Sequence, residues 1–197
     1  SRYSPAMMGS GVFTGVFKLD EINVKTDVNG LSFGHELERI GYAGQEPSGS
    51  REIGTYFELH IEQGPILEAE EKTIGVVTDA QGQRWYEISV NGQESHAGPT
   101  PMLRRRDALL TASKIVQEVN RIGHHHSPYA CATVGHMQVS PNSRNVIPGG
   151  VFMTVDFRHP DDDILTTMDE TLKSYCHELE NLDQVEVDLV DFWYFPP

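Results

Sequence analysis

The sequence predicts a mixed α/β (α+β) protein whose second half contains a four-stranded antiparallel sheet covered by two helices. Three observations indicate this fold. Residues 84–90 alternate between two sets of side chains, as a half-buried strand does. Residues 108–122 and 164–179 repeat apolar side chains at intervals of three and four, as amphipathic helices do. The order of the elements, strand, helix, strand, strand, helix, strand, is that of a ferredoxin-like sandwich.

The first part of the chain has a different character and is expected to form a separate domain. It is rich in glycine and irregular up to the stretch Asp79-Ala80-Gln81-Gly82. We therefore predict one domain over residues 1–81 and another over 82–197. The elements predicted in the first domain are a helix at 33–40, a strand at 55–61, a short helix at 66–71 and a strand at 73–78.

The second domain is predicted to follow a regular order. Its first helix is expected to end at Gly123, and its two middle strands are expected to pair antiparallel through a loop rich in turn formers. The predicted elements are a strand at 84–90, a helix at 108–122, strands at 130–139 and 151–158, a helix at 164–179, and a last strand from 185 to about 195.

Composition excludes several classes of partner. The formal net charge of -14 repels phosphate backbones and anionic lipids, so we expect neither nucleic acid nor membrane as a partner. No apolar stretch approaches the ~20 residues of a membrane helix, and no basic-then-apolar leader opens the chain, which predicts a cytoplasmic protein. Cys131 and Cys176 lack the C-x-x-C spacing of redox and zinc motifs, so both are expected to be core thiols.

His60 is a candidate metal ligand, because it stands near the end of a predicted strand and before the tight turn Gln63-Gly64-Pro65. A neutral imidazole on a rigid strand suits zinc, manganese or cobalt. A lone histidine, however, lacks the spacing of a multi-ligand motif. The alternative is a hydrogen-bonded core histidine, with Gln63 as no more than a polar residue at the start of a helix.

His96 is a candidate donor to a developing oxyanion. It lies in the stretch 95–102, where prolines and a glycine restrict the loop, and a histidine on a stiff loop is preorganised as a donor. The alternative is a surface loop that caps the next helix. We interpret the arginines at 104–106 as a solvated first turn, and the histidines at 124–126 as a solvated helix end rather than a metal site.

Asn145 and Arg158 are candidates for holding a substrate carboxylate. Asn145 lies in a loop, and Arg158 closes a predicted strand, so both could reach one pocket mouth. A guanidinium forms two parallel hydrogen bonds with a carboxylate, which makes the pair a plausible clamp. The alternative pairs Arg158 with Asp156 or Asp161 on the surface, and the residues alone do not decide between the two.

Four motifs together resemble one family. They are H-I-E-Q-G-P-I-L-E at 60–68, S-H-A-G-P-T-P-M at 95–102, R-R-D-A-L at 105–109, and N-V-I-P-G at 145–149 followed by D-F-R at 156–158. They are similar to the dinuclear-metal amidohydrolases that comprise N-carbamoyl-L-amino-acid hydrolases, β-ureidopropionases and allantoate amidohydrolases, relatives of aminoacylase and of carboxypeptidase-like metallopeptidases. Stretches at 1–3 and 9–11 extend the resemblance over nearly the whole chain.

The resemblance implies a role for each candidate residue. His60 is a metal ligand, Gln63 contacts the substrate, and His96 stabilises the tetrahedral intermediate and also binds substrate. Asn145 and Arg158 hold the substrate carboxylate. It further implies that residues 1–81 are part of a metallopeptidase-like catalytic domain, and that residues 82–197 are a lid and dimerisation domain through which the protein forms a homodimer.

The implied reaction is metal-dependent hydrolysis of the carbamoyl C–N bond of an N-carbamoyl-amino acid, which releases ammonia, carbon dioxide and the amino acid. The cofactors would be two divalent ions: zinc, manganese or cobalt. The other ligands and the general-base glutamate of the family have no counterpart here, so the isolated chain is expected to be inactive and to hold no ion tightly. The alternatives are an allantoate amidohydrolase and a dimerisation module without chemistry of its own.

Overall fold

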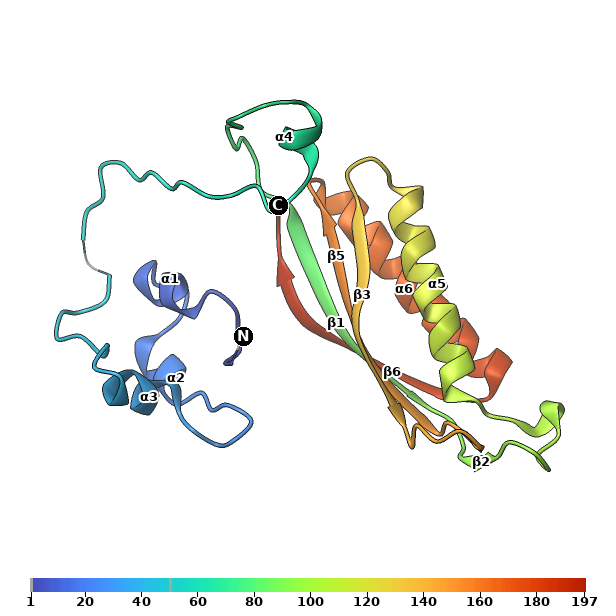
Figure 1. Cartoon of the computed structure of the whole chain (residues 1–197). Coiled ribbons are helices and arrows are strands. Elements are labelled where there is room, and N and C mark those ends of the chain that lie inside the picture. Colours follow the sequence, from blue (N-terminus) through green and yellow to red (C-terminus); the bar gives the residue numbers. More distant parts are fainter. Residues whose placement is uncertain (1, 50) are drawn as a thin grey trace. The chain divides into compact units, whose positions relative to one another are not determined.

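The computed structural model describes residues 2–49 and 51–197 and divides the chain into two compact units, Ser1–Ile66 and Leu67–Pro197 (Figure 1). The first unit contains the helices α1 (Met8–Phe13), α2 (Leu19–Asn23) and α3 (Phe33–Arg39). The side chain of Ser32 caps α3 by accepting a hydrogen bond from the backbone of His35, which confirms the helix predicted there.

A network of ion pairs holds the first unit together. Arg2 bonds to Asp27 at 2.8 Å and to Glu36 at 2.7 Å, and Arg39 bonds to the same Glu36 at 2.8 Å. Glu36 therefore joins the start of the chain to α3. The two arginines lower the pKa of Glu36 to about 2, with Arg39 as the larger cause.

The strands predicted at 55–61 and 73–78 do not form. Both segments are irregular, and their apolar side chains face solvent, with Phe57 89% and Val77 86% exposed. A strand needs a neighbour for its backbone groups, and no segment within residues 2–49 and 51–197 pairs with either run. Between them, the short helix α4 (Ile66–Ala69) forms where it is predicted.

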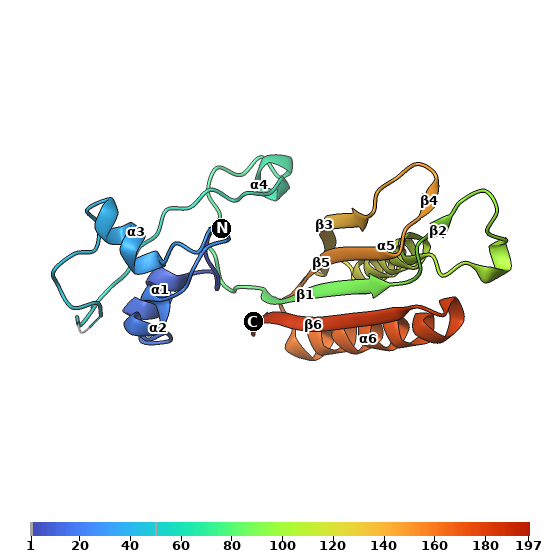
Figure 2. The same ribbon diagram turned by 90° about the horizontal axis from the view of Figure 1, so that it is seen from below.

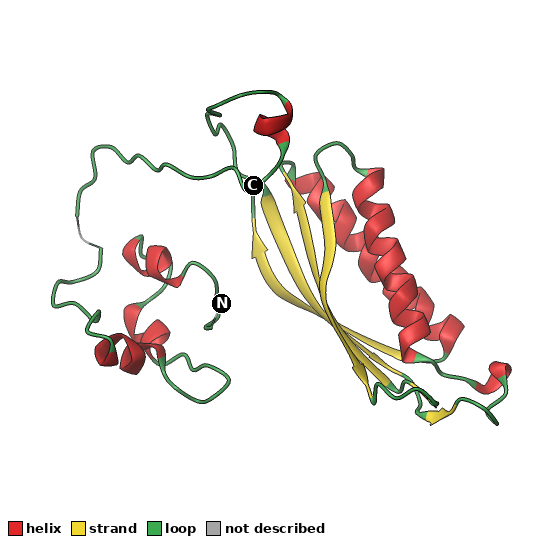
Figure 3. Cartoon of the chain, in the orientation of Figure 1, coloured by secondary structure: helices red, strands yellow, loops and turns green. Residues whose placement is uncertain are grey.

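Four strands of the second unit form the predicted sheet (Figure 3). They lie in the order β3-β5-β1-β6, and every neighbouring pair is antiparallel. This order, with a helix after the first and third of the four, confirms the ferredoxin-like arrangement. The bounds are β1 Gly82–Asn91, β3 Cys131–Ser140, β5 Gly150–His159 and β6 Glu186–Phe195.

Both long helices cover one face of this sheet (Figure 1). They are α5 (Ala108–His125) and α6 (Asp162–Asp183), and an aspartate caps the start of each, Asp107 for α5 and Asp161 for α6. Alternate residues of β5 point into the core, as a period of two requires. Within the described part of the chain, no helix is long and apolar enough to cross a membrane.

Two details differ from the prediction. Helix α5 runs past Gly123 to His125. Gly123 lies against β3, where an added Cβ would be 2.9 Å from the Ala132 side chain, so the glycine permits this close packing and does not end the helix. Cys131 is exposed, since it starts an edge strand. Cys176 is buried as predicted, and burial raises the pKa of its thiol to about 12.

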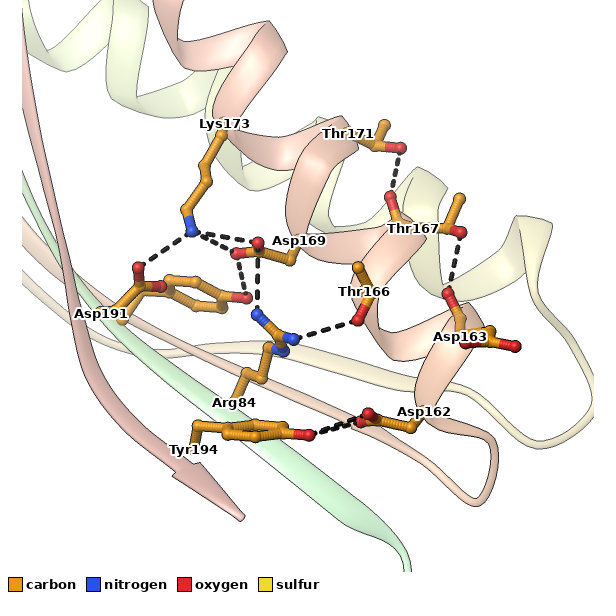
Figure 4. A network of polar contacts seen from close by, with 11 residues as sticks. Arg84, Asp162, Asp163, Thr166, Thr167, Asp169, Thr171, Lys173, Asp191 and Tyr194 are labelled. Atoms are coloured by element: carbon orange, nitrogen blue, oxygen red, sulfur yellow. Dashed lines mark hydrogen bonds and ion pairs between the residues drawn. The ribbon is translucent and has the colours of Figure 1, made fainter. Parts of the chain in front are cut away.

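A buried polar network ties α6 to the sheet (Figure 4). Asp169 accepts a hydrogen bond from the Tyr86 hydroxyl at 2.8 Å and pairs with Arg84 at 3.3 Å and with Lys173 at 2.9 Å. Lys173 also reaches Asp191 of β6 at 2.9 Å. Burial and this hydrogen bond both raise the pKa of Tyr86. The network gives the carboxylate of Asp169 three donors in place of water.

Candidate functional site

The structure brings His96 and Asn145 together at one end of the second unit. His96 lies in the two-residue strand β2 (Ser95–His96), which pairs antiparallel with β4 (Val146–Ile147), so that His96 is opposite Val146. Figure 2 shows β2 and β4 side by side. The backbone N–H of Ala97 donates to the carbonyl oxygen of Asn145 at 2.8 Å. Two candidates 49 positions apart (145 minus 96) therefore share one loop cluster.

The ring of His96 is oriented by its own loop. The backbone N–H of Gly98 donates to His96 Nδ1 at 3.0 Å, so the neutral ring must have its proton on Nε2. The side chain is exposed, and Nε2–H is free to donate to a ligand. This arrangement agrees with an oxyanion donor, and the helix after the loop is capped by Asp107 rather than by the loop's histidine.

Asn145 also presents donors to solvent. Its side-chain oxygen accepts a hydrogen bond from the Ser143 hydroxyl at 3.2 Å, which directs the amide NH2 group outward. The residue is exposed, and its amide nitrogen has no partner among the described residues. Asn145 and His96 can thus both donate to one polar ligand.

Backbone hydrogen bonds hold the loops of this end together. Gly92 donates to the carbonyl of Gly149 at 2.8 Å, and Ala108 donates to that of Pro148 at 3.1 Å. A Cβ on Gly92 would lie 2.2 Å from the Arg106 carbonyl, and one on Gly149 would lie 2.5 Å from Glu94. Only glycine permits this close approach of three chain segments.

Arg105 corrects the interpretation of the arginines as a solvated turn. It is half-buried, and its guanidinium donates to the carbonyl of Ala97 at 2.8 Å and to that of Thr100 at 3.1 Å and 3.2 Å. Arg104 and Arg106 are exposed, as predicted. The sequence offers no signal that separates Arg105 from its two neighbours, because the carbonyls it meets become aligned only in the folded loop.

Arg158 lies at the opposite end of the sheet from Asn145. Eight residue steps of β5 separate it from Gly150, roughly 26 Å at about 3.3 Å per residue. The two therefore do not reach one pocket mouth within the chain. Arg158 pairs with Asp156 at 2.8 Å, the surface alternative of the sequence analysis, and this hydrogen bond raises the pKa of Arg158.

His60 and Gln63 belong to the first unit, and both side chains are exposed. His60 is therefore not the buried core histidine of the alternative. Its Nδ1 lies 2.6 Å from the carbonyl oxygen of Ile61, and a carbonyl only accepts, so Nδ1 carries the proton. Gln63 has a φ of 55° in the turn before α4. The described residues contain no cluster of three or more His, Cys, Asp or Glu side chains suited to a metal ion.

A shallow concavity of about 610 Å³ lies where β3 and β5 lead into the loop that contains Asn145. Its walls include Ser89, Gln138, Asn142 and Phe152, and no charged side chain lines it. It therefore offers polar and apolar contacts but no ion pair for a carboxylate.

Comparison with known proteins identifies relatives that match most or all of this chain. Residues 78–182 match the family of the peptidase dimerisation domain. An N-carbamoyl-L-amino-acid amidohydrolase of Rhizobium meliloti is 51% identical over 161 residues, which are 82% of this chain and 39% of that protein. An allantoate amidohydrolase of Escherichia coli (strain K12) is 32% identical over 203 residues, 98% of this chain and 47% of that protein.

Solved structures agree with these relatives. A crystal structure of an amidase of the hydantoinase/carbamoylase family from Burkholderia multivorans is 62% identical, with a TM-score of 0.86 over 100% of this chain and 48% of that one. The similarity extends across both units. The chain spans about two fifths to one half of the length of these relatives.

Proposed function

Because the chain belongs to the amidohydrolase family of N-carbamoyl-L-amino-acid amidohydrolases and allantoate amidohydrolases, with the family's dimerisation domain at residues 78–182, we propose that it serves in hydrolysis of a ureido C–N bond. The observation that supports this most is the preorganised pair of His96 and Asn145, whose free N–H donors lie on one braced loop cluster. A substrate with a ureido group and a carboxylate offers the acceptors that such donors need.

We assign the substrate contacts as follows. His96 Nε2–H donates to the oxygen of the carbamoyl carbonyl as negative charge develops on it, and Asn145 and Arg158 bind the substrate carboxylate. Gln63 makes a further polar contact. Water and an N-carbamoyl-amino acid give the amino acid, ammonia and carbon dioxide. The motif at 95–102 and the higher identity to an N-carbamoyl-L-amino-acid amidohydrolase, 51% against 32% for an allantoate amidohydrolase, favour the carbamoyl-amino-acid branch. Allantoate, which has a similar ureido group and carboxylate, is the second candidate.

His60 suits the role of one metal ligand. Since its Nδ1–H donates to the carbonyl of Ile61, the lone pair of Nε2 is left for an ion. The remaining ligands would come from outside the described residues, where full-length relatives have further chain. We propose two divalent ions, zinc, manganese or cobalt, which when bound polarise the carbonyl and lower the pKa of a water toward ~7.

We further propose that the protein is a homodimer and that His96 completes the partner's site. Arg158 lies beside Gln83, where β1 begins, whereas His96 and Asn145 lie beyond the other end of β5, whose length from Gly150 to Arg158 is roughly 26 Å. One substrate is too small to touch both ends of one subunit. A two-fold dimer through residues 82–197 would bring the far end of one subunit to the near end of the other, and the edge strands β3 and β6 are open for pairing.

The proposed reaction is tested in the full-length protein, incubated with manganese, cobalt or zinc and offered N-carbamoyl-amino acids or allantoate. We expect hydrolysis of an N-carbamoyl-amino acid, and we expect the chain of residues 1–197 alone to be inactive. Preference for allantoate would select the second candidate. If neither substrate reacts with any of the ions, while the chain dimerises, the dimerisation module is the better account. A cytoplasmic location stays a prediction.

The trans arrangement predicts complementation between two inactive variants of the full-length protein. His96→Ala should lower kcat about a hundredfold, as loss of an oxyanion donor does, and His60→Ala should lose metal. When subunits of the two variants are exchanged, one site of each mixed dimer has both residues, so activity should return. Mixtures that exchange subunits and stay inactive would place His96 in its own subunit's site.

The assignment of Arg158 predicts that its substitution by lysine harms the reaction although the charge is kept. Lysine cannot form the two parallel hydrogen bonds of a guanidinium, so KM should rise about tenfold or more. Asp156→Asn serves as the control, because it removes the present partner of Arg158 and should leave the guanidinium available to substrate. Unchanged kinetics in Arg158→Lys would show that Arg158 only pairs with Asp156.

A further inference from the structure

The loop that presents His96 has little secondary structure to fix it. Strand β2 is only two residues long, and the loop then runs through Pro99 and Pro101 to a short 3-10 helix at Met102–Arg104. Neither proline has a backbone N–H, so the loop has few donors of its own to satisfy its carbonyls. Something else must hold this loop if His96 is to keep one orientation.

Arg105 meets this requirement. It follows the short helix at once, and its side chain folds back across the loop that precedes the helix. One guanidinium nitrogen, Nη2, donates to the carbonyls of both Ala97 and Thr100, and Nε donates to Thr100 as well. The two carbonyls lie on either side of Gly98 and Pro99. A rigid fork of donors thus closes the turn that follows His96.

Ala97 connects the guanidinium of Arg105 to Asn145. Its carbonyl accepts from Arg105 at 2.8 Å, while its N–H donates at 2.8 Å to the carbonyl of Asn145. The next residue, Gly98, supplies the N–H that fixes the tautomer of His96. A shift of this one turn would therefore disturb the ring of His96 and its spacing from Asn145 together.

We propose that Arg105 is a positioning residue for the reaction, which holds the 97–100 turn so that His96 Nε2–H and Asn145 present one fixed pair of donors. The proposal rests on the proposed function for its catalytic consequence, but its structural part does not. This role requires no contact between Arg105 and substrate. Arg105 acts through the backbone of Ala97 and Thr100. Lysine cannot replace it, because a lone ammonium has no second nitrogen in a rigid plane to keep the Nε bond to Thr100 together with the two bonds of Nη2.

The structural part is tested on the chain of residues 1–197 by nitrogen NMR of the His96 ring in alkaline buffer, where imidazoles are neutral. In the parent chain, Nδ1 should be unprotonated and Nε2 protonated. Arg105→Ala and Arg105→Lys should each give a mixture of the two tautomers. Arg104→Ala is the matched control, because Arg104 is exposed and its side chain has no polar contact among the described residues. If Arg105→Ala does not fold, Arg105→Lys decides.

The catalytic part is tested in the full-length protein with the same variants. Misplacement of a catalytic group by about 1 Å costs up to ~100-fold, so Arg105→Lys should lower kcat about 10- to 100-fold with a smaller change in KM. A single His96 tautomer in both Arg105 variants, or a kcat equal to that of Arg104→Ala, would overturn the proposal. A parent enzyme without ureidohydrolase activity would overturn the proposed function instead, and the tautomer experiment would still decide whether Arg105 holds the turn.

Discussion

Residues 51–81 and residues 82–197 both contain apolar runs with the composition of strands, but only the second region folds into a sheet. In β1, Tyr86 and Ile88 are 1% and 0% exposed, because β5 and β6 pair with it on both sides and two helices cover it. Between 55 and 61, Phe57 and Leu59 are 89% and 102% exposed. The difference lies in the neighbours and not in the residues themselves, since strand propensity expresses packing against a partner more than a preference of the backbone.

This difference also indicates that the apolar runs of residues 51–81 need a partner to pair with. Exposed apolar runs without a paired neighbour favour association with another chain or segment. The chain spans about half of the length of its relatives or less, so we expect segments of a full-length protein to pair with 55–61 and 73–78. His60 would then stand at the end of a formed strand, as its motif predicts.

The largest expected effect is a difference in stability between alanine substitutions of two phenylalanines. Phe157 of β5 is fully buried, so Phe157→Ala should lower the free energy of unfolding by about 3–5 kcal/mol, through lost burial and the cavity left behind. Phe57→Ala should change it by about 0.5 kcal/mol or less, because the side chain of Phe57 is 89% exposed and has little burial to lose. Denaturant unfolding followed by circular dichroism measures both. Equal losses in the two variants would mean that residues 55–61 are packed in solution and would end the comparison.

A smaller loss of stability is expected from a substitution in the polar network that joins β1 to α6. Asp169→Ala would leave the hydroxyl of Tyr86 and the guanidinium of Arg84 without their buried acceptor, which should cost about 3 kcal/mol. The adjacent Glu170 is exposed and has no polar partner among the described residues, so Glu170→Ala is the matched control. The same unfolding measurement compares the two. A loss in Asp169→Ala no larger than in Glu170→Ala would show that the network contributes little.

The sequence predicts the fold of residues 82–197 well because its signals are local and consistent. Period-two and three-and-four patterns place every long element, and the order of elements determines the sheet. Gly123 shows where this reasoning fails. Its small size serves the contact of α5 with Ala132, and a sequence pattern cannot distinguish such a contact from a helix end. The exposure of Cys131 differs from the prediction for a related reason, because edge and central strands have similar sequences.

The candidate site could be predicted only residue by residue. The motifs indicate His60, His96, Asn145 and Arg158 as candidates. Spacing along the chain does not reveal that the length of β5, roughly 26 Å from Gly150 to Arg158, lies between the last two. The proximity of His96 to Asn145 depends on the pairing of β2 with β4. Each of these strands has only two residues, and no sequence pattern predicts their pairing. Arg105 was hidden among three arginines, because only its folded position aligns it with two carbonyls.

The smallest expected effect tests how the first unit is held together without a sheet. Two of its ion pairs meet at Glu36. Arg39 and Arg2 lower the pKa of the Glu36 carboxyl from its usual value near 4.5 to about 2. A carboxyl group whose pKa is lower in the folded state than in the unfolded state stabilises the folded state at pH values above the unfolded-state pKa. This stabilisation is lost as the pH falls through the folded-state pKa. The contribution should therefore be complete above about pH 4.5 and disappear as the pH falls toward about 2.

This loss can be followed through the ring contact between Tyr3 and Phe33, whose centroids lie 5.3 Å apart and which gives proton NMR contacts. Those contacts should weaken between about pH 4.5 and about pH 2, while the sheet of the second unit, which has no part in this network, is followed separately. Glu36→Gln should abolish the pH dependence in that window, and Glu38→Gln, at an exposed position on the same helix, should leave it unchanged. If the carboxyl of Glu36 titrates near 4.5 instead, the arginines do not hold it. The first unit would then depend on apolar burial, such as the ring contact of Tyr3 with Phe33 and the burial of Ile22, rather than on charge.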